Sequence, residues 1–299
     1  MIEIKNLTKR FDNILALNNV TITVEKGQVY GLVGSNGSGK STLLRILSGI
    51  FMPDSGTVTI DGEAVYDNPK IKEKIAFVSD SPCFFLHANL IDMAKFYARL
   101  YPRFSFERLE EINKIFPIDK KAKLQNMSKG MQRQAAVMLA LACQPDYLFL
   151  DEAFDGLDPV MRDALKGIIA CEIEDNGLTV IISSHNLREL EELCDSVGLI
   201  HFSDLVFSKA VSDIKTDIHK IQTAFKNLPE ESEFNELELL KSERTGNLIQ
   251  LIVKGDMDKI KPIIEAVEPI FFEEIPLTLE EIFIYELGGK GYDVSHVIQ

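Results

Sequence analysis

No stretch of this 299-residue sequence is apolar over 18 or more residues, so no segment is expected to cross a membrane as a helix. The chain starts directly with a strand-like pattern and shows no signal peptide, which predicts a cytoplasmic protein. Its four cysteines, Cys83, Cys143, Cys171 and Cys194, show no C-x-x-C spacing. This argues against a cysteine metal site and favours free thiols in a reducing compartment.

Positive charge is also scarce. The sequence holds 32 Lys and Arg residues against 46 Asp and Glu residues, a formal net charge of −14. Binding to nucleic acid requires a basic surface, so we expect no nucleic-acid partner. The imbalance is strongest near the C-terminus, because residues 211–299 contain 18 acidic and 9 basic residues. That part is expected to present a solvated acidic face.

A glycine-rich loop lies between the apolar run Val29–Val33, a predicted strand, and Leu43–Leu47, a predicted helix. It matches the phosphate-binding pattern G-x-x-x-x-G-K-[ST] through Gly34, Ser35, Asn36, Gly37, Ser38, Gly39, Lys40, Ser41 and Thr42. Such a loop surrounds phosphates with backbone N–H groups, and the next helix directs its positive end at them. The lysine reaches the β- and γ-phosphates and the serine hydroxyl binds Mg²⁺. The loop therefore predicts a nucleoside triphosphate site.

The pattern around this loop alternates strands and helices, which predicts an α/β core. Residues 1–24 alternate apolar and polar side chains, as antiparallel strands do, with a polar loop at Lys9–Asn13. Helical spacing dominates residues 88–142. Tyr147–Leu150 and Thr179–Ser183 are unbroken apolar runs, typical of a buried parallel sheet, and a helix is expected between them from Pro159 to Glu174.

After about residue 208 the pattern becomes that of a small α+β domain, so we expect two domains, 1–210 and 211–299. The second domain is expected to hold strands at Ile221–Phe225, Leu237–Leu240, Leu248–Val253 and Ile270–Ile275, and helices at Asp256–Val267 and Leu279–Leu287. Thr278 and Glu281 form a capping box for the last helix. No chemical motif occurs in this domain, and its role as a dimerisation module, a ligand sensor or a structural addition stays open.

Two adjacent carboxylates, Asp151 and Glu152, follow the apolar run that ends at Leu150. The carboxyl ends of strands are where an open α/β sheet binds its ligands. Asp151 suits Mg²⁺, directly or through water, and Glu152 suits the activation of an attacking water. The alternative is a helix start with two solvated acids, which the phosphate loop nearby disfavours.

Four further segments stand in a fixed order around these motifs. Phe11 precedes the phosphate loop, Asn126–Gln132 precedes the Asp-Glu pair, Phe154–Asp158 follows it, and Ile182–His185 ends the next apolar run. Over roughly residues 1–210 the sequence thereby resembles the ATP-binding subunits of ABC transporters, which carry an adenine-stacking aromatic, a signature, a D-loop and a switch histidine in this order. The resemblance implies a P-loop NTPase core of ABC type, with a mixed sheet and a helical insert at about residues 86–142.

The resemblance also implies ATP and Mg²⁺ as cofactors and ATP hydrolysis as the activity. Two subunits would pack head to tail, so that Ser128 and Gly130 of one subunit face the γ-phosphate that Lys40 of the other holds. His185 would contact this phosphate and hold the attacking water with Glu152. One chain carries one loop and one signature, so two copies would complete both sites, which predicts a homodimer.

Two residues of the implied site, Phe11 and His185, keep alternatives. Phe11 is expected to stack on the adenine, although it could instead pack on the strand beneath it. His185 could be a histidine that caps its strand. Asp158 closes the D-loop and is expected at the ATP site.

The sequence departs from the family pattern at two places. In the signature, Lys129 and Met131 replace the family's first Gly and its Gln, a form similar to exporter-type variants. Asp80 stands where the family has Gln. We expect Asp80 to keep a contact to Mg²⁺ through an oxygen atom; the alternative is that the loop only relays motion.

The leading hypothesis is an ATPase subunit on the cytoplasmic face of a membrane, whose dimer closes on two ATP and drives a separate membrane-spanning partner, with export favoured over import. The helical insert and the Asp80 loop would dock on that partner, and Phe84–Leu86 is a candidate contact, with core packing as the alternative. The rival hypotheses are an ABC-type ATPase that acts on a ribosome, DNA or a protein, and a nucleotide-binding regulator without turnover.

Overall fold

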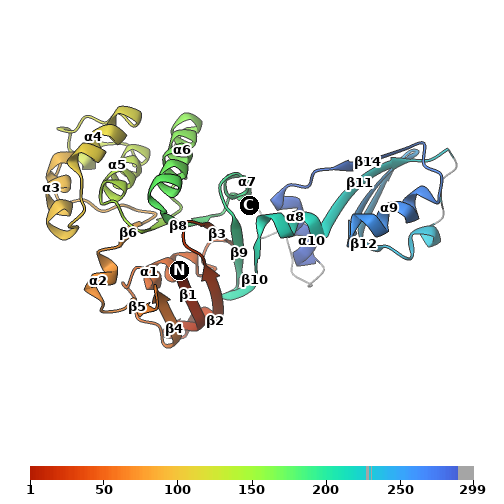
Figure 1. Ribbon diagram of the computed structural model, residues 1–299, viewed down its shortest axis with the longest axis horizontal. Coiled ribbons are helices and arrows are strands. Elements are labelled where there is room, and N and C mark those ends of the chain that lie inside the picture. Colours follow the sequence, from red (N-terminus) through yellow and green to blue (C-terminus); the bar gives the residue numbers. More distant parts are fainter. Residues whose placement is uncertain (227–228, 230, 289–299) are drawn as a thin grey trace. The chain divides into compact units, whose positions relative to one another are not determined.

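The computed structural model of the chain describes residues 1–226, 229 and 231–288 (Figure 1). The chain divides into two compact units, which we describe one at a time: residues 1–186 with 193–208, and residues 187–192 with 209–299. The last part of the expected second domain, residues 289–299, lies outside the described residues. The boundary predicted at residue 210 stays a prediction, and segment 187–192 groups with the second unit although it precedes that boundary.

A mixed sheet forms the centre of the first unit, in the order β5-β4-β1-β2-β10-β9-β3-β8-β7-β6. Its strands are β1 (Ile2–Phe11), β2 (Ile14–Val24), β3 (Val29–Val33), β4 (Ser55–Ile60), β5 (Glu63–Ala64), β6 (Ile75–Val78), β7 (Tyr147–Asp151), β8 (Thr179–Ser184), β9 (Ser196–His201) and β10 (Asp204–Ala210). β1 pairs antiparallel with β2 and β4, whereas β3, β6, β7, β8 and β9 run parallel. The predicted mixed sheet, with its antiparallel strands at the N-terminus, is confirmed.

Three neighbouring parallel strands place the chemical motifs at one edge of the sheet. Every residue of β3, β7 and β8 is buried, which explains why their sequences are almost continuously apolar. Because β8 lies between β3 and β7, the carboxyl ends of all three strands are adjacent. The phosphate loop follows β3, His185 follows β8, and the Asp-Glu pair ends β7. This edge is where an α/β sheet binds ligands.

The helices of the first unit are α1 (Lys40–Leu47), α2 (Pro69–Lys72), α3 (Leu90–Leu100), α4 (Phe106–Ile115), the 3₁₀ turn η1 (Leu124–Asn126), α5 (Lys129–Ala142) and α6 (Pro159–Asn176). The helical prediction for residues 88–142 is confirmed by α3, α4 and α5. The predicted start of α6 is confirmed as well, since the Asp158 side chain accepts a hydrogen bond from the Met161 N–H at 3.0 Å and Pro159 is the first helical residue.

The polar loop predicted at Lys9–Asn13 is wrong in its extent. β1 continues through Phe11 and β2 starts at Ile14, so that only Asp12 and Asn13 form the turn. Asp12 adopts a φ of 49°, a left-handed conformation that Asp tolerates and that lets the hairpin reverse tightly. Polar residues next to the turn belong to the strands because a hairpin exposes one of its faces.

The second unit is built on a four-stranded antiparallel sheet in the order β12-β13-β11-β14, from β11 (Ile218–Ala224), β12 (Glu238–Thr245), β13 (Leu248–Lys254) and β14 (Phe271–Ile275). Its helices are α7 (Leu187–Glu191), α8 (Val211–Asp217), the 3₁₀ turn η2 (Glu231–Phe234), α9 (Met257–Glu265) and α10 (Leu279–Gly288). The α+β prediction is confirmed, as is the capping box, in which Thr278 and Glu281 exchange hydrogen bonds of 3.0 and 3.2 Å. The sequence did not predict α7 or α8.

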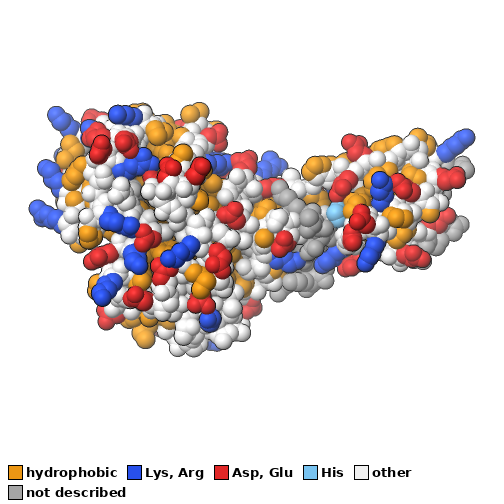
Figure 2. Space-filling view, in the orientation of Figure 1, with side chains coloured by type: hydrophobic (Ala, Val, Ile, Leu, Met, Phe, Trp, Pro, Cys, Tyr) orange, Lys and Arg blue, Asp and Glu red, His pale blue; other side chains and the backbone are white. Residues whose placement is uncertain are grey.

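Charged side chains of both signs are interspersed on the face of the molecule that Figure 2 shows. Among the described residues, no helix is both long enough and apolar enough to span a membrane.

Candidate nucleotide site

The glycine loop leaves β3 at Gly34 and enters α1 at Lys40. Gly39 adopts a φ of 116°, and a methyl group there would collide with the carbonyl oxygen of Ala16, so this position requires glycine. The buried Lys40 ammonium donates to the carbonyl oxygens of Gly34 at 2.6 Å and Ser35 at 3.1 Å. The lysine is therefore held inside the curve of the loop, where the phosphate-binding pattern requires its charge.

Three carboxylates lie close enough to the Lys40 ammonium to affect its pKa. Burial lowers the pKa of Lys40, while Glu152, Asp151 and Asp155 oppose that change because they favour the charged lysine. A charged ammonium that is desolvated inside the loop is a strong hydrogen-bond partner for a phosphate.

Asp151 ends β7 and is completely buried. Its Oδ1 accepts hydrogen bonds from the Ser41 hydroxyl at 3.0 Å and from the Ser183 hydroxyl at 2.7 Å. Its Oδ2 has no hydrogen-bond partner among the described residues. A buried carboxylate oxygen without a partner is costly, and a divalent cation, directly or through water, would satisfy it. The donor set of Ser41 and Asp151, all oxygen, therefore fits Mg²⁺ well.

A cavity of about 260 Å³ opens over the loop. Its lining combines the end of β1, the start of β2, the loop and the Asp-Glu pair: Phe11, Ile14, Leu15, Ala16, Asn36, Gly37, Gly39, Lys40, Ser41, Thr42 and Glu152. The structure thus brings Phe11 together with the phosphate loop and Glu152, as expected for one binding site. Ser38 lies beside them in the loop, and its buried hydroxyl has no hydrogen-bond partner among the described residues.

Phe11 has both an exposed ring and contacts within the chain, and its predicted stacking on the adenine stays a prediction. It lines the cavity and is 39% exposed, so its ring is available to a ligand. Its ring also meets the edge of Phe51 at a centroid distance of 5.3 Å, and the Lys9 ammonium lies 5.3 Å from its centre. These contacts hold the ring in place without covering it.

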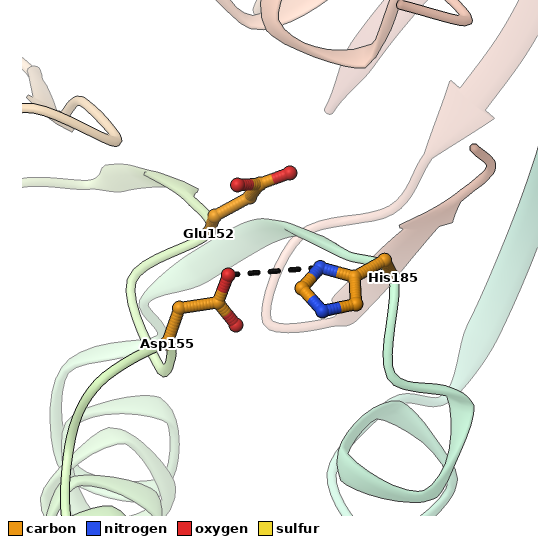
Figure 3. Close-up of side chains that lie close together, drawn as sticks. All are labelled: Glu152, Asp155 and His185. Atoms are coloured by element: carbon orange, nitrogen blue, oxygen red, sulfur yellow. Dashed lines mark ion pairs between the residues drawn. The ribbon is translucent and has the colours of Figure 1, made fainter. Parts of the chain in front are cut away.

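Glu152 and His185 lie close together at the ends of β7 and β8 (Figure 3). Glu152 adopts a left-handed conformation with a φ of 49°, a strain of about 1 kcal/mol or more for a residue with a Cβ. Its N–H donates to the Ser183 hydroxyl and carbonyl at 3.1 and 3.2 Å, which fixes the turn. His185 Nδ1 lies 3.6 Å from Asp155 Oδ2. Ligand atoms of Glu152, Asp155 and His185 all lie within 4.8 Å of one another.

The signature residues sit at the start of α5. The Ser128 hydroxyl caps this helix by accepting from the Met131 N–H at 3.2 Å, and Lys129 and Gly130 begin it. The described residues that line the cavity include neither Ser128 nor Gly130. Gly130 has a role within the chain, because a methyl group there would lie 2.7 Å from the carbonyl oxygen of Gly156 in the D-loop. Asp158, in turn, caps α6.

Asp80 follows β6 and pairs with two arginines. Its carboxylate lies 3.4 Å from the Arg45 guanidinium on α1, and its carbonyl oxygen accepts from Arg133 on α5 at 2.7 Å. The structure therefore gives the Asp80 carboxylate a cationic partner, Arg45. The predicted metal contact of Asp80 stays a prediction.

Sequence reasoning missed four residues that shape this site. Ser183 joins Asp151 to Glu152 by hydrogen bonds, and the pairing of Asp151 with Ser183 in adjacent strands could have pointed to it. Arg45 and Arg133 carry no motif of their own, and Asp155 lies in the D-loop without a predicted role, because the partners of all three are set only by the three-dimensional fold.

Comparison with known proteins agrees with this geometry. The ABC transporter family model matches residues 17–155. The chain is 30% identical to the ABC transporter ATP-binding protein YtrB of Bacillus subtilis, over 97% of this chain and 99% of that protein. It is 32% identical to the lantibiotic transport ATP-binding protein SrtF of Streptococcus pyogenes, over 70% of this chain and 90% of that protein. A solved dimeric structure of a bacterial ABC transporter cassette superposes with a TM-score of 0.65 at 25% identity, over 71% of this chain and 99% of that one.

Fold, phosphate loop and buried aspartate together define a P-loop ATPase cassette. The chain belongs to the ATP-binding proteins of ABC transporters, which bind and hydrolyse ATP.

Proposed function

We propose that this chain is the ATPase subunit of an ABC transporter, that two copies enclose two ATP molecules, and that their closing and opening drives a membrane-spanning partner. The observation that carries the site assignment is Asp151, whose Oδ1 is bonded to Ser41 beside the loop cavity while its buried Oδ2 stays without a partner. This arrangement suits a metal–triphosphate complex.

The residues on the loop side would bind and orient the nucleotide. The loop N–H groups and the Lys40 ammonium hold the β- and γ-phosphates, and Phe11 packs on the base. Ser41 and Asp151 would hold Mg²⁺, which when bound neutralises phosphate charge. Glu152, which lines the cavity, accepts a proton from the attacking water. His185 holds this water or the γ-phosphate.

The other half of each site would come from a second copy. Ser128 and the first N–H groups of α5 form an anion site at a helix of 14 residues. Because these residues do not line the cavity of their own chain, a partner's cavity is the natural place for them. Gly130 of the signature lies close to Gly156 of the D-loop, two residues before Asp158. The D-loop and the signature would therefore form one continuous surface that contacts the partner.

The membrane-spanning partner would dock near the Asp80 loop. Phe85 is 54% exposed and Leu86 is 73% exposed, so they are not core residues, which favours the contact over the packing alternative. The chain would work at the cytoplasmic face of the membrane. Export is the direction we propose, on the strength of the Lys129 and Met131 signature variant.

Purification of a tagged Glu152→Gln chain from detergent-solubilised membranes with ATP and Mg²⁺ tests this function. We expect a multi-span membrane protein in fixed proportion to the tagged chain. The matched control is the same chain with Lys40→Ala added, which cannot retain ATP and should recover less of that protein. Recovery of ribosomes, or of no partner in the presence of ATP, would contradict the transporter assignment and favour the rival hypotheses.

A further inference from the structure

The D-loop of this chain carries a carboxylate, Asp155, close to His185, the histidine that follows β8. Figure 3 shows the Asp155 and His185 side chains directed at each other, with Glu152 beside them. The distance from Asp155 Oδ2 to His185 Nδ1 is 3.6 Å. This distance is longer than a hydrogen bond, but catalytic contacts often shorten when the substrate binds.

Both partners are held by the ends of neighbouring strands. Asp155 belongs to the turn that follows β7, where its N–H donates to the Glu152 carbonyl at 3.1 Å. Glu152 is tied in turn to Ser183 of β8, two residues before His185. β7 and β8 pair in register up to Asp151 and Ser183, so the turns that carry Asp155 and His185 leave the sheet side by side.

A carboxylate beside one ring nitrogen of a histidine determines which of the two nitrogens can bind another group. An ionised carboxylate only accepts hydrogen bonds, so a hydrogen bond from Nδ1 to Asp155 requires a proton on Nδ1. The tautomer and the orientation of an imidazole follow from the hydrogen bond that one of its nitrogens makes. With Nδ1 directed at Asp155, Nε2 is the nitrogen that remains for a water or a phosphate.

We propose that Asp155 is a positioning residue for ATP hydrolysis, which holds His185 through Nδ1 so that Nε2 faces the nucleotide. This inference rests on the role proposed above for His185. Asp155 itself touches no substrate. It acts through the histidine, and an amide oxygen at the same place would serve as acceptor nearly as well.

Steady-state ATPase kinetics of the full chain test the proposal. We expect Asp155→Ala to lower kcat about 10-fold with little change in KM for ATP, because the ring loses its orientation while the nucleotide site stays intact. Asp155→Asn should recover most of that loss. In a His185→Ala background, Asp155→Ala should have no further effect. Asp163→Asn is the matched control, since Asp163 is 79% exposed on α6. An unchanged kcat in Asp155→Ala, or equal losses in Asp155→Ala and Asp155→Asn, would overturn the proposal.

A spectroscopic readout separates this inference from the proposed function. Long-range ¹H–¹⁵N correlation of the ¹⁵N-histidine-labelled chain, assigned with His185→Ala, should show His185 protonated at Nδ1. Asp155→Ala should move that signal toward the Nε2-protonated form. If the signal does not move while Glu152→Gln and His185→Ala abolish hydrolysis, Asp155 does not position the ring but the proposed function stands. If His185→Ala hydrolyses ATP at the parent rate, the role of His185 itself is wrong.

Discussion

The α-carbon of Gly130 faces the carbonyl oxygen of Gly156 so closely that a methyl group on it would lie 2.7 Å from that oxygen. The signature helix α5 and the D-loop therefore pack backbone to backbone within one chain. A glycine that the family resemblance assigns to phosphate contact also has a structural reason to be glycine. The two surfaces that each site would borrow from a second copy are joined to each other.

This contact predicts that Gly130→Ala destabilises the chain, because backbone atoms cannot yield as a flexible side chain does. We expect a loss of about 1–3 kcal/mol in the free energy of unfolding, measured by urea titration. Gly167→Ala is the control: Gly167 lies in α6 with open space around it, so alanine there should be neutral or stabilising by up to about 1 kcal/mol. Equal stability of the two variants would show that the Gly130 contact is loose.

The buried carboxylate of Asp151 predicts a strong dependence on Mg²⁺. Asp151→Asn keeps the shape and the hydrogen bonds to Ser41 and Ser183 but removes the charge that would face the cation. We expect kcat to fall by about 100-fold or more. The Mg²⁺ concentration that gives half-maximal activity should rise. A titration of ATPase activity against Mg²⁺ measures both. An unchanged Mg²⁺ requirement would mean that another group holds the metal.

The ion pair between Asp80 and Arg45 predicts that Asp80, unlike Asp151, does not affect the dependence of the ATPase on Mg²⁺. Both side chains are part-exposed, so the pair contributes less than about 1 kcal/mol to stability. If the role of Asp80 is to pair with Arg45, Asp80→Asn should leave the Mg²⁺ requirement of the ATPase unchanged. Exchange of the two residues, Asp80→Arg with Arg45→Asp, should then work better than either single reversal. A raised Mg²⁺ requirement in Asp80→Asn would restore the metal contact predicted from the sequence.

The exposed ring of Phe11 predicts a loss of nucleotide affinity without loss of turnover. Replacement of a stacking aromatic by alanine costs about 1–3 kcal/mol per base. Phe11→Ala should therefore raise the Kd for both ATP and GTP by roughly 5- to 100-fold, since stacking does not distinguish bases. Phe11→Tyr is the matched control and should bind as the parent does. Unaltered affinity in Phe11→Ala would mean that the ring only packs against Phe51.

Much of the site could be predicted from the sequence because its motifs follow strands whose sequences are unmistakable. Val29–Val33, Tyr147–Asp151 and Thr179–Ser184 are buried on both faces, and so their apolar runs stand out. Once the sheet is parallel, the residues after these strands must meet at one edge. The cavity over the loop, with Lys40 and Glu152 in it, follows from that rule.

What the sequence could not predict depends on side chains that meet across loops. Asp155 is one polar residue in a turn, and only the register of β7 and β8 brings it to His185. Arg45 is a charged residue on a helix like many others in the sequence, and only the folded structure places Asp80 beside it. The hairpin at Asp12 is tighter than the sequence predicts for a local reason, since the left-handed conformation of Asp12 shortens the turn to two residues.

The central claim is that each ATP lies between two chains, and retention of nucleotide by mixed variants tests it most directly. In a Glu152→Gln background, a Lys40→Ala chain lacks the loop half of the site and a Ser128→Glu chain lacks the signature half, so neither should retain ATP alone. Their heterodimer combines one intact Lys40 with one intact Ser128. We predict that the mixture retains about one ATP for each heterodimer isolated by gel filtration with two different affinity tags. Retention at the parent level by the Ser128→Glu chain alone, or none by the isolated heterodimer, would contradict the shared site.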